Sequence, residues 1–274
     1  MTFVSFFAGI GGGDLGFEAA GHVCLAQIEN DPICRQVLRA HWSATAILGD
    51  IHHVDAADLP KAGLHIVSDP CQMNTTANSR INSGRTQPSL WREAYRIISE
   101  TRPAFVVREN PTHQRKDAPS RHEYVAAQLE NSGYVCTIID MQGGEVSGVS
   151  RQRTFVCAGL GPAGERLHQL LARHRCAKRD WPSHGSAAQP FAALTCHPYR
   201  YDNRDNIVAY PDGRCRVLGV RERLRAQGLP QTWLDCLGGV GLFRAAKLTG
   251  NAWPPFMAEF IGRLLMDGQH GGMQ

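Results

Sequence analysis

Short apolar runs alternate with segments of helical periodicity along the first part of the chain. The apolar runs have the length of buried strands, and the segments between them place apolar side chains three or four positions apart. Repeated strand–helix units are typical of a parallel sheet with helices on both faces. We therefore expect an α/β fold with strands at Thr2–Phe7, Val23–Ile28, Leu64–Ser68 and Phe105–Arg108, and helices at Asp14–Ala20, Pro32–Trp42 and Leu90–Thr101.

The pattern continues in a modified form after the fourth strand. A helix is expected over Arg121–Ser132, followed by two strands, Val135–Met141 and Thr154–Leu160, that would form a hairpin-like pair at the edge of the sheet. Helical spacing returns at Val220–Gln227 and Pro255–Met266, so the end of the chain should pack on the main domain.

The region between these segments differs in composition. Residues 161–213 are rich in Arg, His, Pro and Ser, carry interspersed aromatic residues and show little periodicity. We expect a small separate lobe there. The resulting division is a main domain over residues 1–160, a lobe over 161–213 and a return to the main domain over 214–274.

Composition adds limits to this picture. The 274 residues are 43% hydrophobic and 20% charged, which excludes a disordered, collagen-like or coiled-coil protein. No apolar run approaches the roughly 18 residues of a membrane span, and the start of the chain lacks the basic segment of a signal peptide, so we expect a soluble, cytoplasmic protein. The net charge of +4 permits an acidic partner without requiring one. The nine singly spaced cysteines are expected to be reduced, and they predict no metal site.

A glycine-rich turn follows the first strand. Gly11, Gly13 and Gly16 have the spacing of a dinucleotide-binding turn between a strand and a helix. Glu29 lies at the end of the second strand, and Asp50 follows Ile47 and Leu48, where a further strand would end. Glu29 could accept hydrogen bonds from ribose hydroxyls, and Asp50 could accept one from an adenine amino group. The alternative is a turn that only packs helix on strand, with both acids as solvated caps. Ligands bind at the carboxyl ends of strands in open α/β sheets, which favours a cofactor site.

A long polar segment, Asn74–Ser89, separates the strand at Leu64–Ser68 from the next helix. It consists largely of Asn, Thr, Ser, Arg and Gly. A connection of this length in a compact domain is usually a lid or a binding loop.

Five motifs resemble, in family order, signatures of the DNA (cytosine-5)-methyltransferases. Phe7–Gly12 resembles the first signature, and Glu29–Asp31 and Gly49–Ile51 resemble the second and third. Near the end of the chain, Arg216–Pro230 and Gly250–Pro255 resemble the ninth and tenth. The resemblance covers nearly the whole chain except the lobe.

The resemblance implies a Rossmann-like methyltransferase sheet with a small second recognition lobe. It also implies S-adenosylmethionine as cofactor, with Phe7 beside the adenine, Glu29 on the ribose hydroxyls and Asp50 on the adenine amine. The cofactor-binding residues that it implies are Phe7, Gly9, Ile10, Gly12, Glu29, Asn30, Asp50, Ile51, Asp69, Leu90, Asn251 and Ala252.

Three further elements resemble catalytic motifs of the family. Pro70–Gln72 resembles the nucleophile motif, in which the thiolate, here Cys71, adds to cytosine C6 so that C5 can accept a methyl group. Glu109–Pro111 resembles the motif whose carboxylate binds N3 and the amino group of a flipped base. Arg153 resembles the residue that holds cytosine O2, and Arg151 one that supports the nucleophile loop or a phosphate. The alternatives are a buried structural cysteine and a solvated acid at a strand end.

Three positions depart from the family pattern. Asp69 stands where an apolar residue or proline is usual, and a neighbouring carboxylate tends to raise the pKa of a thiol. Cys71 is therefore expected to be a slower nucleophile unless Asp69 points away from it. Asn74 and Thr75 replace a Phe-Ser pair, although Thr75 can still donate to a phosphate, and Ser150 stands where Pro-Gln is expected.

The lobe is expected to contact DNA. The region between Arg153 and Arg216 is small for a sequence-specific module, which usually buries about 600 Å² or more, so recognition should be short, relaxed or dependent on a second protein subunit. Its basic residues beside aromatic ones could contact phosphates and stack on bases, or could form only a solvated basic face. The residues expected to contact DNA are Gln72, Thr75, Arg173, Arg175 and Arg179.

The resemblance implies methyl transfer from S-adenosylmethionine to C5 of a flipped cytosine in DNA, in a bacterial or phage setting such as restriction-modification. A non-catalytic or weakly active partner subunit is one alternative. A nicotinamide oxidoreductase built on the same glycine turn is a second. The same C5 chemistry with another donor, with RNA or with a free nucleotide is a third.

Overall fold

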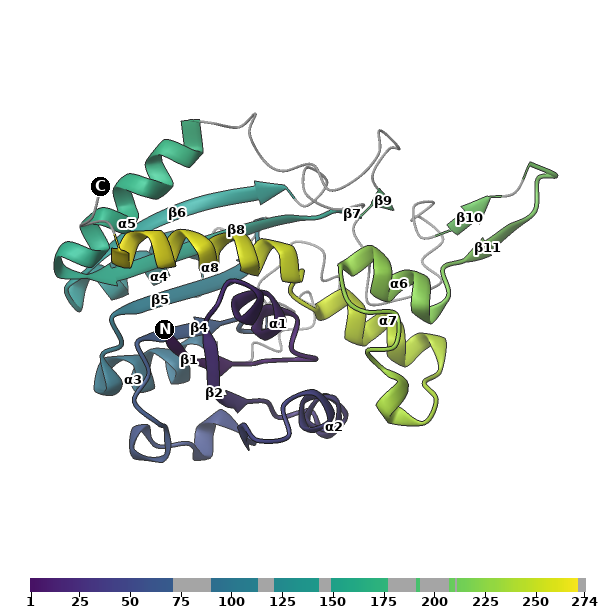
Figure 1. Ribbon diagram of the computed structural model, residues 1–274, viewed down its shortest axis with the longest axis horizontal. Coiled ribbons are helices and arrows are strands. Elements are labelled where there is room, and N and C mark those ends of the chain that lie inside the picture. The colour runs from purple at the N-terminus through teal and green to yellow at the C-terminus, as the bar shows by residue number, and fades with distance from the viewer. Residues whose placement is uncertain are drawn as a thin grey trace, which may run out of the picture.

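A seven-stranded sheet forms the centre of the molecule, with the strand order β3-β2-β1-β4-β5-β8-β6 (Figure 1). The computed structural model describes residues 1–70, 90–112, 121–142, 149–176, 191–192, 207–209 and 211–270. Five strands run parallel to one another, namely β1 (Thr2–Phe6), β2 (Val23–Ile28), β3 (Ala46–Leu48), β4 (Leu64–Val67) and β5 (Phe105–Pro111).

The last two strands depart from the parallel arrangement. β6 (Tyr134–Gln142) and β8 (Gln152–Leu160) pair antiparallel, and β8 also pairs antiparallel with β5. The expected hairpin-like pair at the edge of the sheet is confirmed. The short connection that contains β7 (Val149–Ser150) cannot supply the dozen or more residues of a parallel crossover, so the chain returns antiparallel.

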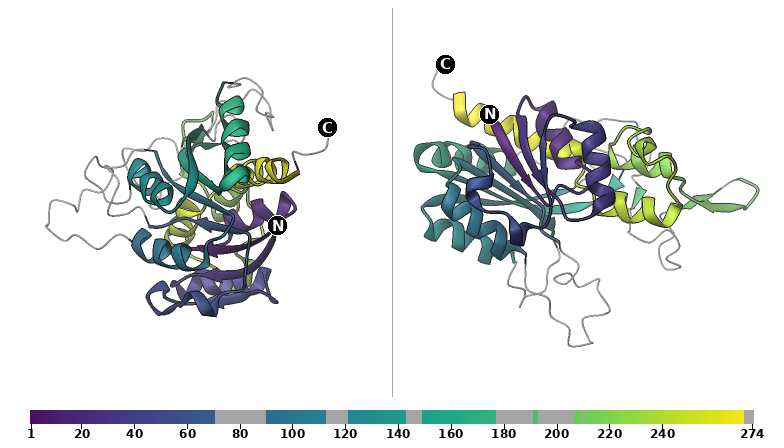
Figure 2. Two further views of the ribbon diagram at one scale, coloured as in Figure 1. Left: turned by 90° about the vertical axis from the view of Figure 1, so that its left-hand side faces the viewer. Right: turned by 90° about the horizontal axis from the view of Figure 1, so that it is seen from below.

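Helices cover both faces of the sheet, as expected (Figure 2). Alternate side chains of β1 point to opposite faces, and so Phe3 and Val4 belong to different core clusters. One face packs against α1 (Gly12–Ala19), α2 (Pro32–His41), α5 (Gly161–Cys176) and α8 (Pro255–His270), and the other against α3 (Trp91–Thr101) and α4 (His122–Asn131).

Two further helices, α6 (Val220–Gln227) and α7 (Leu242–Asn251), pack against each other beyond the end of the sheet (Figure 1). The helix expected at Val220–Gln227 is confirmed with the same bounds. In the described part of the chain, no helix has the length and apolar character needed to cross a membrane.

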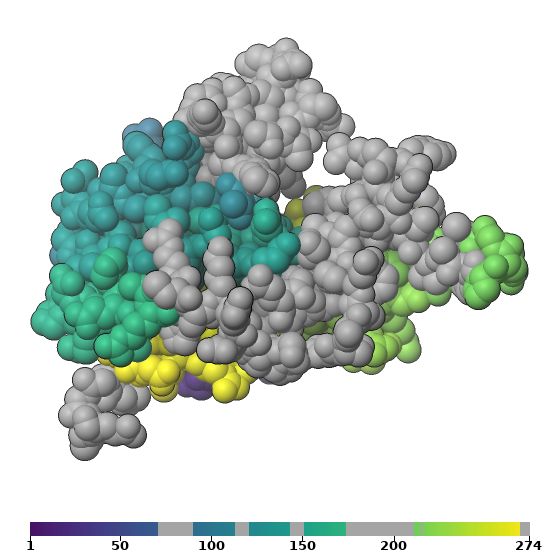
Figure 3. Space-filling model, turned by 90° about the horizontal axis from the view of Figure 1, so that it is seen from above, coloured from purple at the N-terminus to yellow at the C-terminus, as the bar shows by residue number. Residues whose placement is uncertain are grey.

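Helix α5 was not expected from the sequence. Its buried Leu167 and Leu171 lie four positions apart on one face, and the helix packs on β6, β8 and α8. Figure 3 shows the green surface of α5 beside the yellow surface of α8. Residues 161–176 therefore belong with the sheet in the structure. The division into a main domain and a lobe stays a prediction, because residues 177–190 and 193–206 lie outside the described residues.

The glycine turn brings the two ends of the chain together. A Cβ atom at Gly12 would lie 2.1 Å from the carbonyl oxygen of Trp253, and one at Gly16 would lie 2.1 Å from that of Pro255. These glycines allow α1 to approach the C-terminal segment closely. Gly9 differs from them, because its φ of +59° favours glycine and a Cβ atom there would meet nothing within 4 Å. Close packing therefore explains why glycine is needed at positions 12 and 16. At Gly9 the space around the Cα atom is open, and the positive φ explains the glycine.

Candidate functional site

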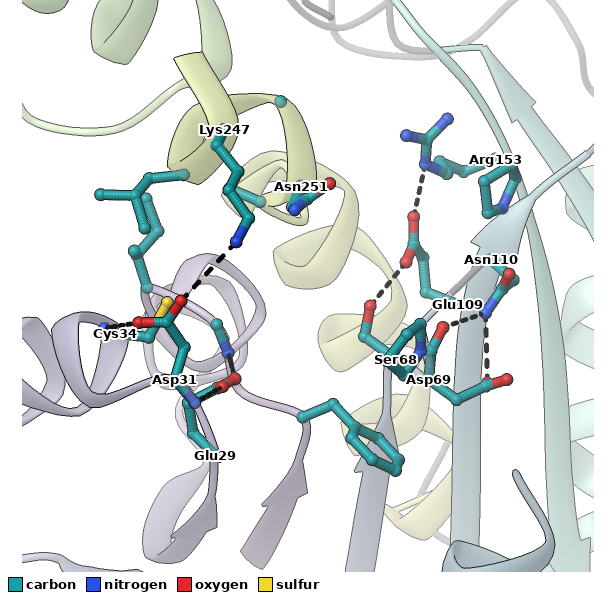
Figure 4. Close-up of a pocket in the computed structure, with 18 of the residues that line it drawn as sticks. Glu29, Asp31, Cys34, Ser68, Asp69, Glu109, Asn110, Arg153, Lys247 and Asn251 are labelled. Carbon is teal, nitrogen blue, oxygen red and sulfur yellow. Dashed lines mark hydrogen bonds and ion pairs between the residues drawn. The ribbon is translucent and has the colours of Figure 1, made fainter. Parts of the chain in front are cut away.

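A cavity of about 240 Å³ lies at the carboxyl ends of β1, β2, β4 and β5. This is the edge at which open α/β sheets bind ligands. Residues after these strands form one wall, and β8 and α7 contribute the other. Its polar side chains form two groups, with Glu29, Asp31 and Lys247 at one end and Ser68, Asp69, Glu109, Asn110 and Arg153 at the other (Figure 4).

Two backbone amides hold the carboxylate of Glu29 at the first end. The amide of Gly9 donates to Oε2 at 2.7 Å, and that of Asp31 donates to Oε1 at 2.7 Å. Burial raises the pKa of Glu29, and these backbone hydrogen bonds oppose the rise. Each carboxylate oxygen can accept a further hydrogen bond, so Glu29 is suited to bind hydroxyl groups of a ligand.

A positively charged side chain, that of Lys247, also lies at this end of the cavity. Asp31 caps the start of α2 by accepting hydrogen bonds from the amides of Ile33 at 2.8 Å and Cys34 at 3.3 Å. The Nζ atom of Lys247 lies 3.9 Å from Oδ2 of Asp31. Lys247 was not singled out from the sequence, although it lies four residues before Asn251 and so on the same face of α7.

Apolar side chains gather beside the glycine turn. Phe7, whose φ is +58°, packs against the core cluster that contains Ile51, and Leu48 and Leu90 pack against the same cluster. The carboxylate of Asp50 is partly exposed and accepts a hydrogen bond of 2.7 Å from Nδ1 of His52. Among the expected cofactor residues, Phe7, Gly9, Ile10, Glu29, Asp69, Asn251 and Ala252 line the cavity, whereas Gly12, Asn30, Asp50, Ile51 and Leu90 lie outside its wall.

Glu109 anchors the other end of the cavity and is 4% exposed, so it is not a solvated acid. Its Oε2 accepts a hydrogen bond of 2.9 Å from the hydroxyl of Ser68. Its Oε1 forms an ion pair with Nε of Arg153 at 2.6 Å. The ends of β4, β5 and β8 thus bring these three side chains together (Figure 4).

The carboxylate of Asp69 is paired within the fold. It accepts two hydrogen bonds from Arg108, at 2.6 Å from Nε and 3.0 Å from Nη2, and both side chains are buried. The amide of Asn110 donates to the backbone oxygen of Asp69 at 2.8 Å and to its carboxylate at 3.1 Å. Asp69 therefore points to β5. The signal missed in the sequence was a charged Arg108 directly after the apolar residues 105–107.

Arg151 connects β8 to the end of α7. Its Nη2 donates to the backbone oxygen of Gly250 at 2.9 Å, and the side chain is buried. The expected roles of Arg151 toward the nucleophile loop or a phosphate stay predictions. This contact instead fixes the segment that carries Asn251 and Ala252 against the base of the cavity.

Several predicted site residues lie outside the described residues, namely Cys71, Gln72, Thr75 and Arg179. Pro70, which precedes Cys71 in the sequence, lines the cavity. Arg173 is exposed on α5, and the side chain of Arg175 is not described. Within the described ranges, no group of His, Cys, Asp and Glu side chains is arranged to hold a metal ion.

Two solved structures share the fold over almost their whole length. DNMT2 of Spodoptera frugiperda is 12% identical, with a TM-score of 0.71, and the match covers 97% of this chain and 99% of that one. The Dnmt2 methyltransferase of S. pombe is 15% identical, with a TM-score of 0.70, and the match covers 98% of this chain and 99% of that one. The expected α/β methyltransferase fold is confirmed.

Sequence comparison places the likeness in the first part of the chain. The type II methyltransferase M.FnuDI of Fusobacterium nucleatum is 33% identical over 110 residues, which is 40% of this chain and 32% of that protein. M2.BsuMI of Bacillus subtilis is 28% identical over 139 residues, 49% of this chain and 35% of that protein. The chain thus spans about a third of the length of these curated relatives. Residues 1–162 match the family model for C-5 cytosine-specific DNA methylases, and the chain belongs to that family.

Proposed function

We propose that the chain transfers a methyl group from S-adenosylmethionine to C5 of a cytosine in DNA. One observation carries the proposal. A single cavity joins the hydroxyl acceptor Glu29 to the buried pair of Glu109 and Arg153, and Pro70 brings the chain that enters Cys71 to its wall.

The residues at the first end fit the donor. Glu29 offers a carboxylate already oriented by two amides, which suits the two ribose hydroxyls. The open space at Gly9 lets the backbone lie close to a ligand. Asn251 and Ala252 form the part of the wall proposed for the methionine end. The donor supplies an electrophilic methyl group, and these residues bind and orient it.

Glu109 and Arg153 fit the cytosine. A base in this end of the cavity could donate its amino group to the Glu109 carboxylate and share a proton at N3. The guanidinium of Arg153 has five donors, so pairing with Glu109 leaves donors available for O2 of the base. Hydrogen bonds at N3 and O2 stabilise the negative charge that develops on the ring when a nucleophile adds to it.

Cys71 is the proposed nucleophile. Its thiolate would form a bond to C6, and the electron pair released toward C5 would form the new carbon–carbon bond as the methyl group leaves the sulfonium sulfur. A base would then remove the C5 proton, and that electron pair would restore the ring double bond and expel the Cys71 thiolate. Atoms and charge balance, and the enzyme is regenerated.

Access to C5 and C6 requires the cytosine to leave the helical stack, which costs a few kcal/mol. We propose that residues 72–89 close over the flipped base and that Gln72 and Thr75 contact the DNA there. Arg173, Arg175 and Arg179 are proposed to contact phosphates. We propose that sequence recognition is short or relaxed, or depends on a second subunit.

The test is transfer of a labelled methyl group from S-adenosylmethionine to duplex DNA, to RNA and to free cytidine nucleotides. We expect labelled 5-methylcytosine in DNA and a covalent complex with duplexes that contain 5-fluorocytosine. Both should be lost in Cys71→Ala and retained in the matched control Cys236→Ala, which removes an exposed thiol. Label in RNA alone would overturn the assignment of DNA, and a covalent complex with Cys71→Ala would overturn the nucleophile.

A further inference from the structure

Arg108 is a fully buried arginine that lies behind the cavity wall. Its side chain has 0% exposure and forms a bidentate pair with Asp69. Its Nη1 lies 3.2 Å from Nδ1 of His122, and its guanidinium carbon lies 5.7 Å from the centre of the Trp91 ring. A buried charge needs such partners, because an unpaired one is strongly destabilising.

His122 extends this pairing to the segment that follows Glu109. Its Nε2 lies 3.1 Å from the backbone oxygen of Pro111, which can only accept a hydrogen bond. The network therefore assigns the ring hydrogen to Nε2 and leaves Nδ1 to accept from Arg108. Burial and the nearby Arg108 charge both lower the pKa of His122, in agreement with a neutral ring.

Three contacts tie the end of β4 to the end of β5. Asp69 binds Arg108, Asn110 binds the backbone and side chain of Asp69, and Ser68 binds Glu109. Both strand ends line the cavity, yet Arg108 itself is not part of the wall. Arg108 thus sits where it can set the relative position of the two proposed catalytic segments without touching a ligand.

We propose that Arg108 is a positioning residue. Its pair with Asp69 balances the charge of that carboxylate, which precedes the proposed nucleophile by two residues in the sequence, and it holds the chain that leads to Cys71 against the strand that carries Glu109. Only the expected effect on methyl transfer rests on the proposed function; the expected effect on Cys71 reactivity does not. The titratable group in contact with the pair is His122 from α4, which also feels the charges of Glu123 on α4 and Asp140 on β6. The ion pair of Glu109 and Arg153 lines the cavity with Asp69.

The charge balance predicts the direction in which each variant shifts the pH dependence of Cys71 reactivity. Arg108→Gln leaves the Asp69 charge without its partner and should raise the midpoint pH at which Cys71 becomes reactive, by about one unit. Asp69→Asn leaves the positive charge and should lower that midpoint. The double variant removes both charges, leaves no lone buried ion and should return the midpoint close to that of the wild type. A purely structural role would move both single variants in the same direction.

The experiment follows alkylation of Cys71 by iodoacetamide across a pH series, read by mass spectrometry of the peptide that contains it. The full chain is used without donor or DNA, and rates are corrected for the folded fraction measured by circular dichroism. Arg263→Gln, at an exposed arginine paired with Glu259 on α8, is the matched control and should leave the midpoint unchanged. Equal midpoints in all variants, or shifts of both single variants in one direction, would overturn the charge balance.

Positioning is tested by Arg108→Lys, which keeps the charge but cannot form the two-point pair. We expect a midpoint near that of the wild type, with kcat for methyl transfer reduced about tenfold and the dissociation constant of S-adenosylhomocysteine unchanged. An unchanged kcat would overturn the positioning role. If the wild type transfers no methyl group while the midpoints shift in opposite directions, the proposed function fails and the charge balance stands. If the wild type transfers a methyl group but the midpoints do not shift, the proposed function stands and the charge balance fails.

Discussion

The backbone amide of Gly9 donates a hydrogen bond of 2.7 Å to the carboxylate of Glu29, which joins the turn after β1 to the end of β2. The amide of Asp31 binds the second carboxylate oxygen at 2.7 Å. These bonds offset the free energy lost when the carboxylate leaves water. They also fix the carboxylate before a ligand arrives, so binding need not order it.

Glu29→Gln should weaken binding of S-adenosylhomocysteine by about tenfold to a hundredfold, because hydrogen bonds to a charged group contribute roughly 1.5–3 kcal/mol. Calorimetry measures the dissociation constant. Because burial raises the pKa of Glu29, its carboxylate should take up a proton at a higher pH than an ordinary glutamate does. The affinity of the wild type for S-adenosylhomocysteine should therefore begin to fall at that higher pH as the solution is acidified. Glu29→Gln should show no such fall. Glu123→Gln, at an exposed position on α4, should behave as the wild type, and equal affinity in Glu29→Gln would remove that residue from the donor site.

Glu109→Gln should slow methyl transfer by about two to four orders of magnitude, the usual contribution of a general acid or base. Glutamine can keep the hydrogen bond from Ser68, but it cannot take up and return a proton at N3 of the base. Donor affinity should stay within twofold, because Glu109 lies at the other end of the cavity from Glu29 (Figure 4). Single-turnover transfer measures the rate, and a normal rate in a folded variant would contradict the role.

The two ends of the site were predictable from the sequence by different routes. Glu29 follows a short apolar run, and parallel strands bring their carboxyl ends to a single edge. Glu109 was indicated only by the resemblance of Glu109–Pro111 to a family motif. The structure places both in the wall of one cavity. The sequence indicated a glycine turn after the first strand, but it did not indicate that Gly12 and Gly16 pack against Trp253 and Pro255.

The pair of Asp69 and Arg108 was not predictable in the same way. The two residues are 39 positions apart, and the pattern of β5 shows only that a charge lies in an apolar run. Which carboxylate meets it depends on the register of β4 with β5, where Val67 is opposite Arg108. The same limit applies to α5. The spacing of its leucines can be read from the local sequence, but its packing on β6 and β8 depends on segments elsewhere in the chain.

Gly16→Ala should destabilise the fold by about 1–3 kcal/mol, because extra atoms in a close-packed contact force neighbouring backbone apart. The added Cβ atom would lie 2.1 Å from the backbone oxygen of Pro255 and 2.6 Å from Cβ of Ala258. Urea unfolding measures the change. Gly49→Ala is the matched control, because its Cβ atom would meet only Arg35 at 3.8 Å. Equal stability of the two variants would mean that α1 and α8 are less tightly packed than the structure shows.

Asp14 gives a pH dependence that can be measured without any ligand. Its buried carboxylate accepts hydrogen bonds from Gln27 at 2.8 Å and from Ser5 at 3.1 Å, and burial raises its pKa from 3.8 to about 6. The folded state thus binds the proton more tightly than the unfolded state does. This contribution to stability is complete below the unfolded value of 3.8 and is lost as the pH rises to about 6, a difference of about 3 kcal/mol.

Asp14→Asn cannot titrate, and its amide can still accept from Gln27 while the Ser5 hydroxyl reverses to accept from it. The free energy of unfolding of the wild type, minus that of Asp14→Asn, should therefore fall by about 3 kcal/mol across this pH range and level off above it. Urea unfolding at a series of pH values measures the difference, and Asp140→Asn serves as a control at an exposed residue outside this cluster. A difference that does not change with pH would show that Asp14 titrates in the fold as it does in the unfolded chain.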